Sequence, residues 1–261
     1  MKKLAILLIV LMLTCHTRAQ SLSSYAISNG GGYESNAGST WSYTIGELAI
    51  DYYTGSTSLA CGFQQSFQDL MRKVMLTLLL EGLYDGASMR KAQNATGDQY
   101  PGNVADRIRV SLRHPAPPFD NALTIQEVDL KQDGTAECVV DLNFNASYFI
   151  VINHRNHLET WTPSPLDFSS NSIVHDFTLA AANAYGSNMK DLGEGRFGFF
   201  AGDANQDGVI NETDIDMLTM AANVFLTGYL DQDINGDGAV DALDLILIDN
   251  NAAMAISVAH P

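Results

Sequence analysis

Toward its C-terminus the chain repeats one oxygen-rich loop after an interval of 30 residues. Acidic or amide side chains occupy loop positions 1, 3, 5, 9 and 12 of both copies, and glycine occupies position 6. A calcium ion takes about six to eight oxygen ligands, and position 7 of such a loop supplies one through its backbone carbonyl. The spacing therefore predicts sites for two Ca²⁺ ions. The expected ligands are Asp203, Asn205, Asp207, Val209, Asn211 and Asp214 in the first loop, and Asp233, Asn235, Asp237, Ala239, Asp241 and Asp244 in the second.

Two ordinary surface turns are the alternative, because Asp, Asn and Gly are common in turns of every kind. The identical register of the two copies favours metal sites instead. Gly208 and Gly238 stand where a calcium loop needs its sharp bend. Position 12 is Asp214 in one loop and Asp244 in the other, whereas an EF-hand has a bidentate Glu there. The shorter side chain is expected to draw the following helix closer to the ion.

A helix is predicted after each loop, because apolar residues recur there at helical spacing. Gly228 marks the region where the first helix would end. The residues of the two apolar stripes are Ile215, Leu218, Ala222 and Phe225 in the first helix, and Leu243, Ile246, Leu247 and Ala253 in the second.

A calcium loop followed by a helix, twice over and with Asp at position 12, resembles the type I dockerin family. The resemblance covers residues 201–255 and implies a small domain of two antiparallel helices, each preceded by a calcium loop. It also implies a protein partner, a cohesin domain, chosen partly by loop positions 10 and 11. These positions are Glu212-Thr213 in the first loop and Ala242-Leu243 in the second, so the two pairs differ.

The charge of the chain is uneven along its 261 residues, which are enough for two ordinary domains or three small ones. The formal net charge of −16 excludes a nucleic-acid partner, which would need a basic surface. No Lys or Arg follows Arg196, while the segment from Asp203 to Asp249 contributes eleven carboxylates. Bound divalent cations would relieve the repulsion within such a cluster.

Residues 1–19 have the pattern of a secretory signal peptide. Lys2-Lys3 precede ten apolar residues from Leu4 to Leu13, and the small residues Thr17 and Ala19 predict cleavage before Gln20. A lipoprotein signal at Cys15 is the alternative, but Thr14 fits it poorly. Ten apolar residues are too few to span a bilayer, and no later stretch does better. The mature chain is therefore expected outside the cell or at its surface, with no transmembrane segment.

Two cysteines, Cys61 and Cys138, remain after this cleavage. In an exported protein they could form a disulfide. Cys138 also alternates with Val140, Leu142 and Phe144, as on the buried face of a strand, which favours the role of a small buried apolar residue.

Residues 20–70 are rich in Gly, Ser, Thr and Tyr and are predicted to form a β module. Gly30-Gly31-Gly32 and the Gly55-Ser-Thr-Ser segment separate short strands such as Trp41 to Ile50. The segment resembles a short N-terminal β module of bacterial secreted proteins. A flexible glycine-rich spacer is the alternative.

Residues 71–200 are predicted to form a β-sandwich, because short alternating strands are separated by turn signals. Ala146 to Ile152 also resembles prealbumin-like (carboxypeptidase-regulatory-like) modules, over about seventy residues. One helix is expected over 180–190. The predicted strands are Val74–Tyr84, a strand around Ile108, Val110 and Leu112, the hairpin Leu123–Leu130 and Thr135–Phe144 turning at Asp133-Gly134, Tyr148–Asn153, and Ile173–Leu179.

Catalytic motifs are absent from the sequence. His154, His157 and Glu159 could be metal ligands, but on a strand the two histidines would point to opposite faces, and their spacing is not that of a His-Glu-x-x-His helix. There is also no Gly-x-Ser-x-Gly elbow and no Walker loop. The chain is therefore expected not to be an enzyme.

The expected fold class is mostly β with a small C-terminal α domain, 201–261, made of a dockerin-like pair of calcium loop–helix units. The expected function is that of a secreted, calcium-binding, non-catalytic module protein used for structure or protein–protein contact. The partner would be a cohesin-like or other surface protein. The alternative is a dockerin-type assembly subunit that binds a cohesin scaffold in polysaccharide degradation.

Overall fold

The computed structural model describes residues 31–36, 39–44, 52–53, 59–60 and 71–261. The chain divides into two compact units, Met1–Asp69 and Leu70–Pro261. In the first unit two antiparallel pairs are formed, β1 (Gly31–Asn36) with β2 (Ser39–Thr44) and β3 (Tyr52–Tyr53) with β4 (Leu59–Ala60). The predicted signal peptide and Cys61 lie outside the described residues, so the Cys61–Cys138 disulfide stays a prediction.

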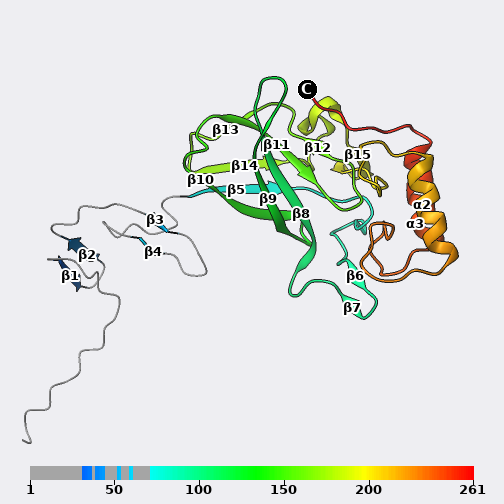
Figure 1. Ribbon diagram of the computed structural model, residues 1–261, viewed down its shortest axis with the longest axis horizontal. Helices are drawn as coiled ribbons and strands as arrows, with labels where there is room; N and C mark the ends of the chain where they lie inside the picture. Colours follow the sequence, from blue (N-terminus) through cyan, green and yellow to red (C-terminus); the bar gives the residue numbers. More distant parts are fainter. Residues whose placement is uncertain (1–30, 37–38, 45–51, 54–58, 61–70) are drawn as a thin grey trace, which may run out of the picture. The chain divides into compact units, whose positions relative to one another are not determined.

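The second unit is built on one eight-stranded sheet with the order β12-β11-β8-β9-β10-β5-β14, and β13 pairs with β11 (Figure 1). Neighbouring strands are antiparallel except β14 and β5, which are parallel. The strands are β5 (Met71–Thr77), β8 (Val104–Arg113), β9 (Asn121–Lys131), β10 (Thr135–Asp141), β11 (Ser147–Asn153), β12 (Thr160–Trp161), β13 (Leu166–Asp167) and β14 (Ser172–Asp176).

The sheet curls around its core instead of lying flat. β9 and β10 form a hairpin but pair only at its turn, through Leu130 and Ala136, so the strands on either side diverge. β8 and β9 also pair over a long stretch with three register shifts, and such bulges increase the local bend. The mostly β class is confirmed. Where two separate sheets were expected, a single curled sheet encloses the core.

The core follows the alternation in the sequence. Ile108, Val110 and Leu112 of β8 are buried, as are Cys138 and Val140 of β10. Successive side chains of a strand point to opposite faces, so one face of each strand supplies the core. Burial also raises the pKa of the Cys138 thiol to about 12.

Two predictions for local structure are wrong. The expected helix over 180–190 is replaced by two short 3₁₀ turns, Ala181–Asn183 and Tyr185–Ser187, because Ala184 between them has an extended backbone and Gly186 has a positive φ. The expected strand over 74–84 ends at Thr77, and a turn closed by Leu83 N–H donating to Leu80 C=O follows it.

Two small hairpins complete the β structure of the second unit. β6 (Gln93–Asn94) pairs with β7 (Gly97–Asp98), and β15 (Lys190–Gly193) pairs with β16 (Arg196–Gly198).

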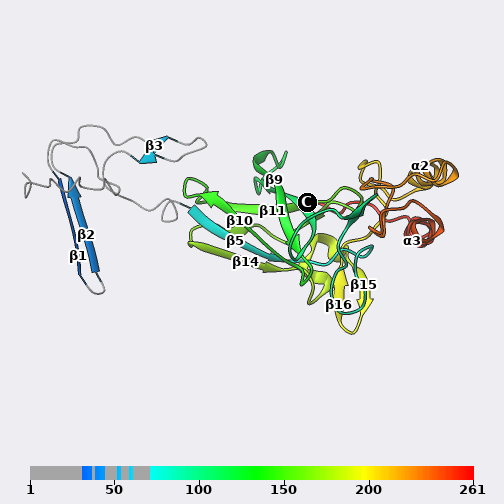
Figure 2. The same ribbon diagram turned by 90° about the horizontal axis from the view of Figure 1, so that it is seen from below.

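The two predicted helices are present, and each begins directly after an oxygen-rich loop. They are α2 (Glu212–Asn223) and α3 (Ala242–Ala252), and Figure 2 shows them side by side at one end of the unit. Leu218 of α2 and Ile248 of α3 are fully buried between them and the rest of the unit.

Part of the predicted apolar stripes is exposed, however. Phe225 is 85% exposed because α2 ends at Asn223, and Phe225 itself has a positive φ that takes its side chain off the helix face. Leu243 and Ile246 of α3 are 56% and 58% exposed. These three side chains of the predicted apolar stripes therefore lie outside the core.

The helices share a core cluster with the chain that precedes them. Leu158, Phe200 and Ala201 pack with Leu218, Ile248 and further buried residues of the C-terminal segment. The predicted domain boundary between 200 and 201 thus falls inside one cluster within one compact unit. In the described part of the chain, no helix is long and apolar enough to cross a membrane.

Candidate metal centre

Ten of the twelve predicted ligands lie in the two loops that lead into α2 and α3, and the other two, Asp214 and Asp244, lie in the first turn of each helix. Position 12 of the first loop, Asp214, is fully buried and organises the loop around its carboxylate. One oxygen accepts hydrogen bonds from Ala204 N–H at 3.0 Å and Asn205 N–H at 3.1 Å, and the other accepts from Asn211 N–H at 3.1 Å. Since Asn211 is the N-cap of α2, the same carboxylate completes a capping box.

The second loop repeats this arrangement bond for bond. Asp244 is fully buried and accepts from Ile234 N–H at 2.8 Å, Asn235 N–H at 2.9 Å and Asp241 N–H at 3.0 Å. Asp241 is the N-cap of α3 and closes the same capping box. This explains why Asp stands at position 12: it is also the third residue of the helix, where its short side chain reaches the N-cap amide.

Position 1 differs between the loops. Asp233 uses both carboxylate oxygens, accepting from Asp237 N–H at 3.1 Å and Gly238 N–H at 3.0 Å. In Asp203 one oxygen accepts from Gly208 N–H at 3.2 Å, while Oδ1 is buried and has no hydrogen-bond partner. A buried, unpartnered carboxylate oxygen is costly unless a cation or donor satisfies it.

Burial raises the pKa of the two position-1 carboxyls, Asp203 and Asp233, to about 6, and it also raises the pKa of Asp214 and Asp244. Most of the remaining predicted ligands are less buried than these four carboxyls. The other loop residues are Asn235, which is buried, the half-buried Asn205, Asn211 and Ala239, and the exposed Asp207, Val209, Asp237 and Asp241.

The carboxylates of each loop are spread apart. Among the described residues, no three His, Cys, Asp or Glu side chains lie close enough to hold a metal ion. Five of the twelve predicted donors, however, are Asn side chains or backbone carbonyls, oxygen donors of the kind that calcium accepts. The chemistry of the donors and the unpartnered Asp203 Oδ1 fit a calcium ion, and loading would have to draw the carboxylates together.

The second loop is held against the sheet domain by several backbone contacts. Arg155 Nη1 and Asn156 Nδ2 each donate to Asp233 C=O at 2.8 Å, and Gln93 N–H donates to Gly236 C=O at 2.9 Å. Gly236 has φ +72°, and a Cβ added there would lie 2.3 Å from Leu83 Cδ2. Only glycine therefore fits at this position of the second loop.

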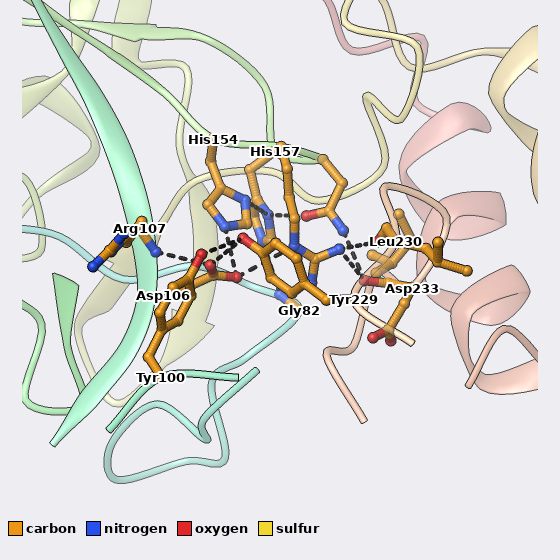
Figure 3. Close-up of polar contacts among 12 residues, drawn as sticks. Gly82, Tyr100, Asp106, Arg107, His154, His157, Tyr229, Leu230 and Asp233 are labelled. Carbon is orange, nitrogen blue, oxygen red and sulfur yellow. Dashed lines mark hydrogen bonds and ion pairs between the residues drawn. The ribbon is translucent and has the colours of Figure 1, made fainter. Parts of the chain in front are cut away.

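A buried ionic cluster lies behind that contact. Asp106, fully buried, accepts from Tyr229 Oη at 2.6 Å and lies 3.1 Å from His154 Nε2 and 3.3 Å from Arg155 Nε. Figure 3 shows Asp106 lying between His154 and Tyr229. Burial alone would raise the pKa of Asp106, but the charges and hydrogen bonds of its neighbours outweigh burial and hold the pKa far below its usual range.

His154 and His157 point toward each other, with 3.0 Å between their Nδ1 atoms, so the prediction of opposite faces is wrong. The reason is that β11 ends at Asn153, and the chain turns there instead of continuing as a strand. His157 Nε2 accepts from Gly82 N–H at 3.1 Å, which places the proton of the neutral ring on Nδ1. Burial, followed by the charges of His154 and Arg155, lowers the pKa of His157 well below 6.5.

A second polar contact ties α3 to the sheet domain. Glu81 accepts from Lys190 Nζ at 2.7 Å, from Ala201 N–H at 2.9 Å and from Asn251 Nδ2 at 2.6 Å. Asn251 is fully buried and also donates to Ala201 C=O at 2.8 Å. The sequence marks neither Glu81 nor Asp106, because no local pattern identifies residues that meet across so long a separation in the chain.

The first loop is held from the opposite side, by the C-terminal segment. Ile210 N–H donates to Ile256 C=O at 2.9 Å, and Val258 N–H donates to Gly208 C=O at 2.8 Å. The position-12 carboxylates of the two loops thus accept the same hydrogen bonds, but different parts of the chain contact each loop.

Comparison with known proteins assigns no family. No family model matches the chain, and no curated protein matches it. Two similar solved structures are an N-terminal and a C-terminal interface mutant of a type II Cohesin-X-Dockerin complex from Acetivibrio cellulolyticus. They are 14% and 16% identical to this chain, cover 69% of it and 94% of their own chain, and superpose with a TM-score of 0.39. A likeness this distant supports no assignment of fold or function.

Proposed function

We propose that residues 203–214 and 233–244 each bind one Ca²⁺ ion. The observation that carries the proposal is the duplicated loop, in which each position-12 carboxylate binds three backbone amides in the same pattern. The buried Asp203 Oδ1, which has no hydrogen-bond partner, supports a cation site at the first loop. The eleven carboxylates between Asp203 and Asp249, with no Lys or Arg among them, provide the negative charge that would attract it.

The test is thermal unfolding of the mature chain with calcium, with EGTA and with magnesium. Calcium that binds only the folded chain stabilises it by RT ln(1 + [L]/Kd), about 2.7 kcal/mol at a hundredfold excess over Kd. EGTA should therefore lower the melting temperature. Magnesium should restore it poorly, because Mg²⁺ requires tight octahedral geometry and releases its water reluctantly. A melting temperature that EGTA leaves unchanged would contradict the proposal.

We further propose that the chain is a secreted, non-catalytic protein that contacts another protein through an exposed apolar surface at α2 and α3. This surface, here called the helix-end surface, consists of Val224, Phe225, Leu226, Leu243 and Ile246, all exposed. The end of α2 and the start of α3 are joined by Val240 N–H donating to Leu226 C=O at 2.9 Å. Exposed apolar side chains gathered in one place are typical of protein contact sites.

Calcium would support such contact indirectly. By fixing the loops it fixes the start of each helix, so little ordering remains to be done when a partner binds. A cohesin-like protein with an apolar face is the partner that the dockerin-like pattern of the loops favours. Leu243 belongs to the residue pair at loop positions 10 and 11, which is the pair that the resemblance implicates in partner choice.

The experiment compares Leu243→Asp with Leu179→Asp in binding to a panel of cohesin domains, with calcium and with EGTA. Leu179 is also exposed but lies away from the helix-end surface, so it controls for the added charge. Leu243→Asp should lose binding while still taking up two calcium ions, and Leu179→Asp should bind normally. Full binding by Leu243→Asp would place the contact elsewhere. If no cohesin binds in calcium, a stand-alone structural role is favoured over the assembly role.

A further inference from the structure

Two neighbouring hollows lie beside the first loop and share the side chains of Arg109, Asn153 and Gln206. The smaller has a volume of about 290 Å³ and is also lined by Tyr100 and Tyr229. The larger, of about 450 Å³, extends along the first loop to the C-terminal segment. Together they form one polar groove of a size that accommodates a small ligand.

Arg109 is the unusual residue in this groove. Among the described residues its guanidinium has one hydrogen bond, from Nε to Asn153 Oδ1 at 3.4 Å, and no carboxylate within ion-pair distance. The other two arginines of the groove are paired. Arg107 contacts Glu127 and Asp129, and Arg155 contacts Asp106. Arg109 is thus half-buried and without an acidic partner, in a chain of net charge −16.

The hydrogen-bond network around Arg109 keeps it available. Asn153 Nδ2 donates to Glu159 Oε2 at 2.7 Å, and Trp161 Nε1 donates to Glu159 Oε1 at 2.7 Å. Both carboxylate oxygens of Glu159 therefore accept hydrogen bonds from neutral donors, and Glu159 forms no ion pair with Arg109. The terminal N–H groups of a guanidinium form a planar fork that matches the two oxygens of a carboxylate.

The rest of the lining suits hydroxyl groups. Asn153, Gln206, Glu159 and Asp207 bring amide and carboxylate oxygens to the groove, which accept hydrogen bonds from hydroxyls. Tyr100 and Tyr229 pack edge to face at 5.8 Å between ring centroids and add an aromatic wall at one end. A ligand that fits must therefore combine one carboxylate with several hydroxyl groups.

We propose that this groove binds an acidic saccharide, whose carboxylate pairs with Arg109 and whose hydroxyls bond to Asn153, Gln206 and Asp207. Asp203 and Asp207 also line the larger hollow. Their charges oppose an anion, and a cation in the first loop would offset them. Calcium should therefore strengthen saccharide binding, a coupling that rests on the proposed calcium function and is reciprocal by linkage.

The experiment is calorimetric titration of the mature, calcium-saturated chain with D-galacturonate, D-galactose and acetate. Galacturonate should bind saturably. Galactose, which lacks the carboxylate, should bind at least about tenfold more weakly because it loses the charged hydrogen-bonded contact to Arg109, and acetate should do so because it loses the hydrogen bonds of the hydroxyls. Arg109→Gln should weaken galacturonate binding about ten- to hundredfold. Arg196→Gln removes the same charge from an exposed hairpin outside the groove and should leave binding unchanged.

Three results would overturn the inference: no saturable binding of galacturonate, equal binding of acetate, or full binding by Arg109→Gln. Calcium uptake is titrated separately on the same samples. Normal calcium binding without galacturonate binding defeats the saccharide site alone and leaves the proposed calcium function intact. Galacturonate binding that is identical in calcium and EGTA defeats only the coupling between the two sites.

Discussion

The first and second calcium loops have the same internal hydrogen bonds but different surroundings. Position 4 of both has a left-handed backbone, with φ +60° at Gln206 and +72° at Gly236. In the first loop a glutamine is tolerated there, and its side chain reaches out to the backbone carbonyl of His154. In the second loop the same position packs against Leu83 and only glycine fits. The repeated sequence thus determines the backbone conformation of the loop, whereas tertiary packing determines which side chains each position tolerates.

The difference extends to what supports each loop. Two side chains next to a buried ionic cluster hold the backbone of the second loop, through Asp233 C=O. The first loop borders the polar groove and is paired with the C-terminal segment. The second loop should therefore be the more rigid of the two, and damage to its support should spread into the sheet domain.

The largest effect is expected from Arg155→Met. This change removes one of the two donors to Asp233 C=O and leaves the buried carboxylate of Asp106 without its guanidinium partner. Breaking a buried ion pair by removing one partner costs about 3–5 kcal/mol. Urea unfolding should show a loss of this size. The control, Arg107→Met, breaks ion pairs with two exposed carboxylates, which solvent screens, so it should cost far less. Equal losses for both variants would mean that the cluster does not support the second loop.

The next effect concerns the two calcium ions. The second loop has four carboxylates at side-chain ligand positions and the first has three. Because ligand charge is one determinant of affinity, the second loop should bind calcium more tightly. Calorimetric titration should show that Asp233→Ala removes the tighter site, and thermal unfolding should show the loss of the roughly 2.7 kcal/mol that one site contributes at a hundredfold excess. If Asp203→Ala removes the tighter site, the unpartnered Asp203 Oδ1 matters more than the charge count.

The position-4 comparison can be tested by exchanging residue types. Gly236→Ala places a Cβ against Leu83 and strains a positive φ, so it should destabilise the chain by about 2 kcal/mol. Gln206→Ala keeps a Cβ where one is already present and should cost much less. Both variants are measured by thermal unfolding in calcium. A small loss for Gly236→Ala would indicate that the second loop can move away from the sheet domain.

The smallest effect is a pH dependence from His157, whose pKa in the folded chain is lowered well below 6.5. Below about pH 6.5 the unfolded chain binds a proton that the folded chain does not. The unfolding free energy should therefore fall as pH drops, by at most about 1.4 kcal/mol per pH unit for one group. Urea unfolding of the wild type and of His157→Gln at pH 7.5 and 5.5, at fixed calcium, isolates this contribution. Identical pH slopes for the two proteins would exclude it.

Much of the local structure could be predicted from the sequence. The alternation of Ile108, Val110 and Leu112 predicts β8 and its buried face, and Asp133-Gly134 predicts the turn between β9 and β10. The loop pattern predicts where both helices begin. These features are local, since side-chain periodicity and turn chemistry act over a few residues.

Features that join distant residues could not be predicted. Asp106 meets Tyr229 across 123 positions of the chain, and Asn251 meets Glu81 across 170. The expectation that His154 and His157 point to opposite faces assumes an extended strand beyond Asn153, whereas the chain turns after β11 and brings the two rings together. The apolar spacing up to Phe225 predicts a helix that extends past the end of α2, because a single positive φ leaves no clear sign in the sequence. The calcium ligands themselves remain a prediction.

The pairing of the C-terminal segment with the first loop has a consequence for hydrogen exchange. Ile210 N–H and Val258 N–H donate across the contact between residues that precede α2 and residues that follow α3. One partner of each hydrogen bond precedes α2 and the other follows α3. Unfolding that starts at the C-terminus must therefore break this contact before it reaches either helix. The two amides should exchange with solvent at similar rates, and both should slow together when calcium is added, as members of one cooperatively opening unit.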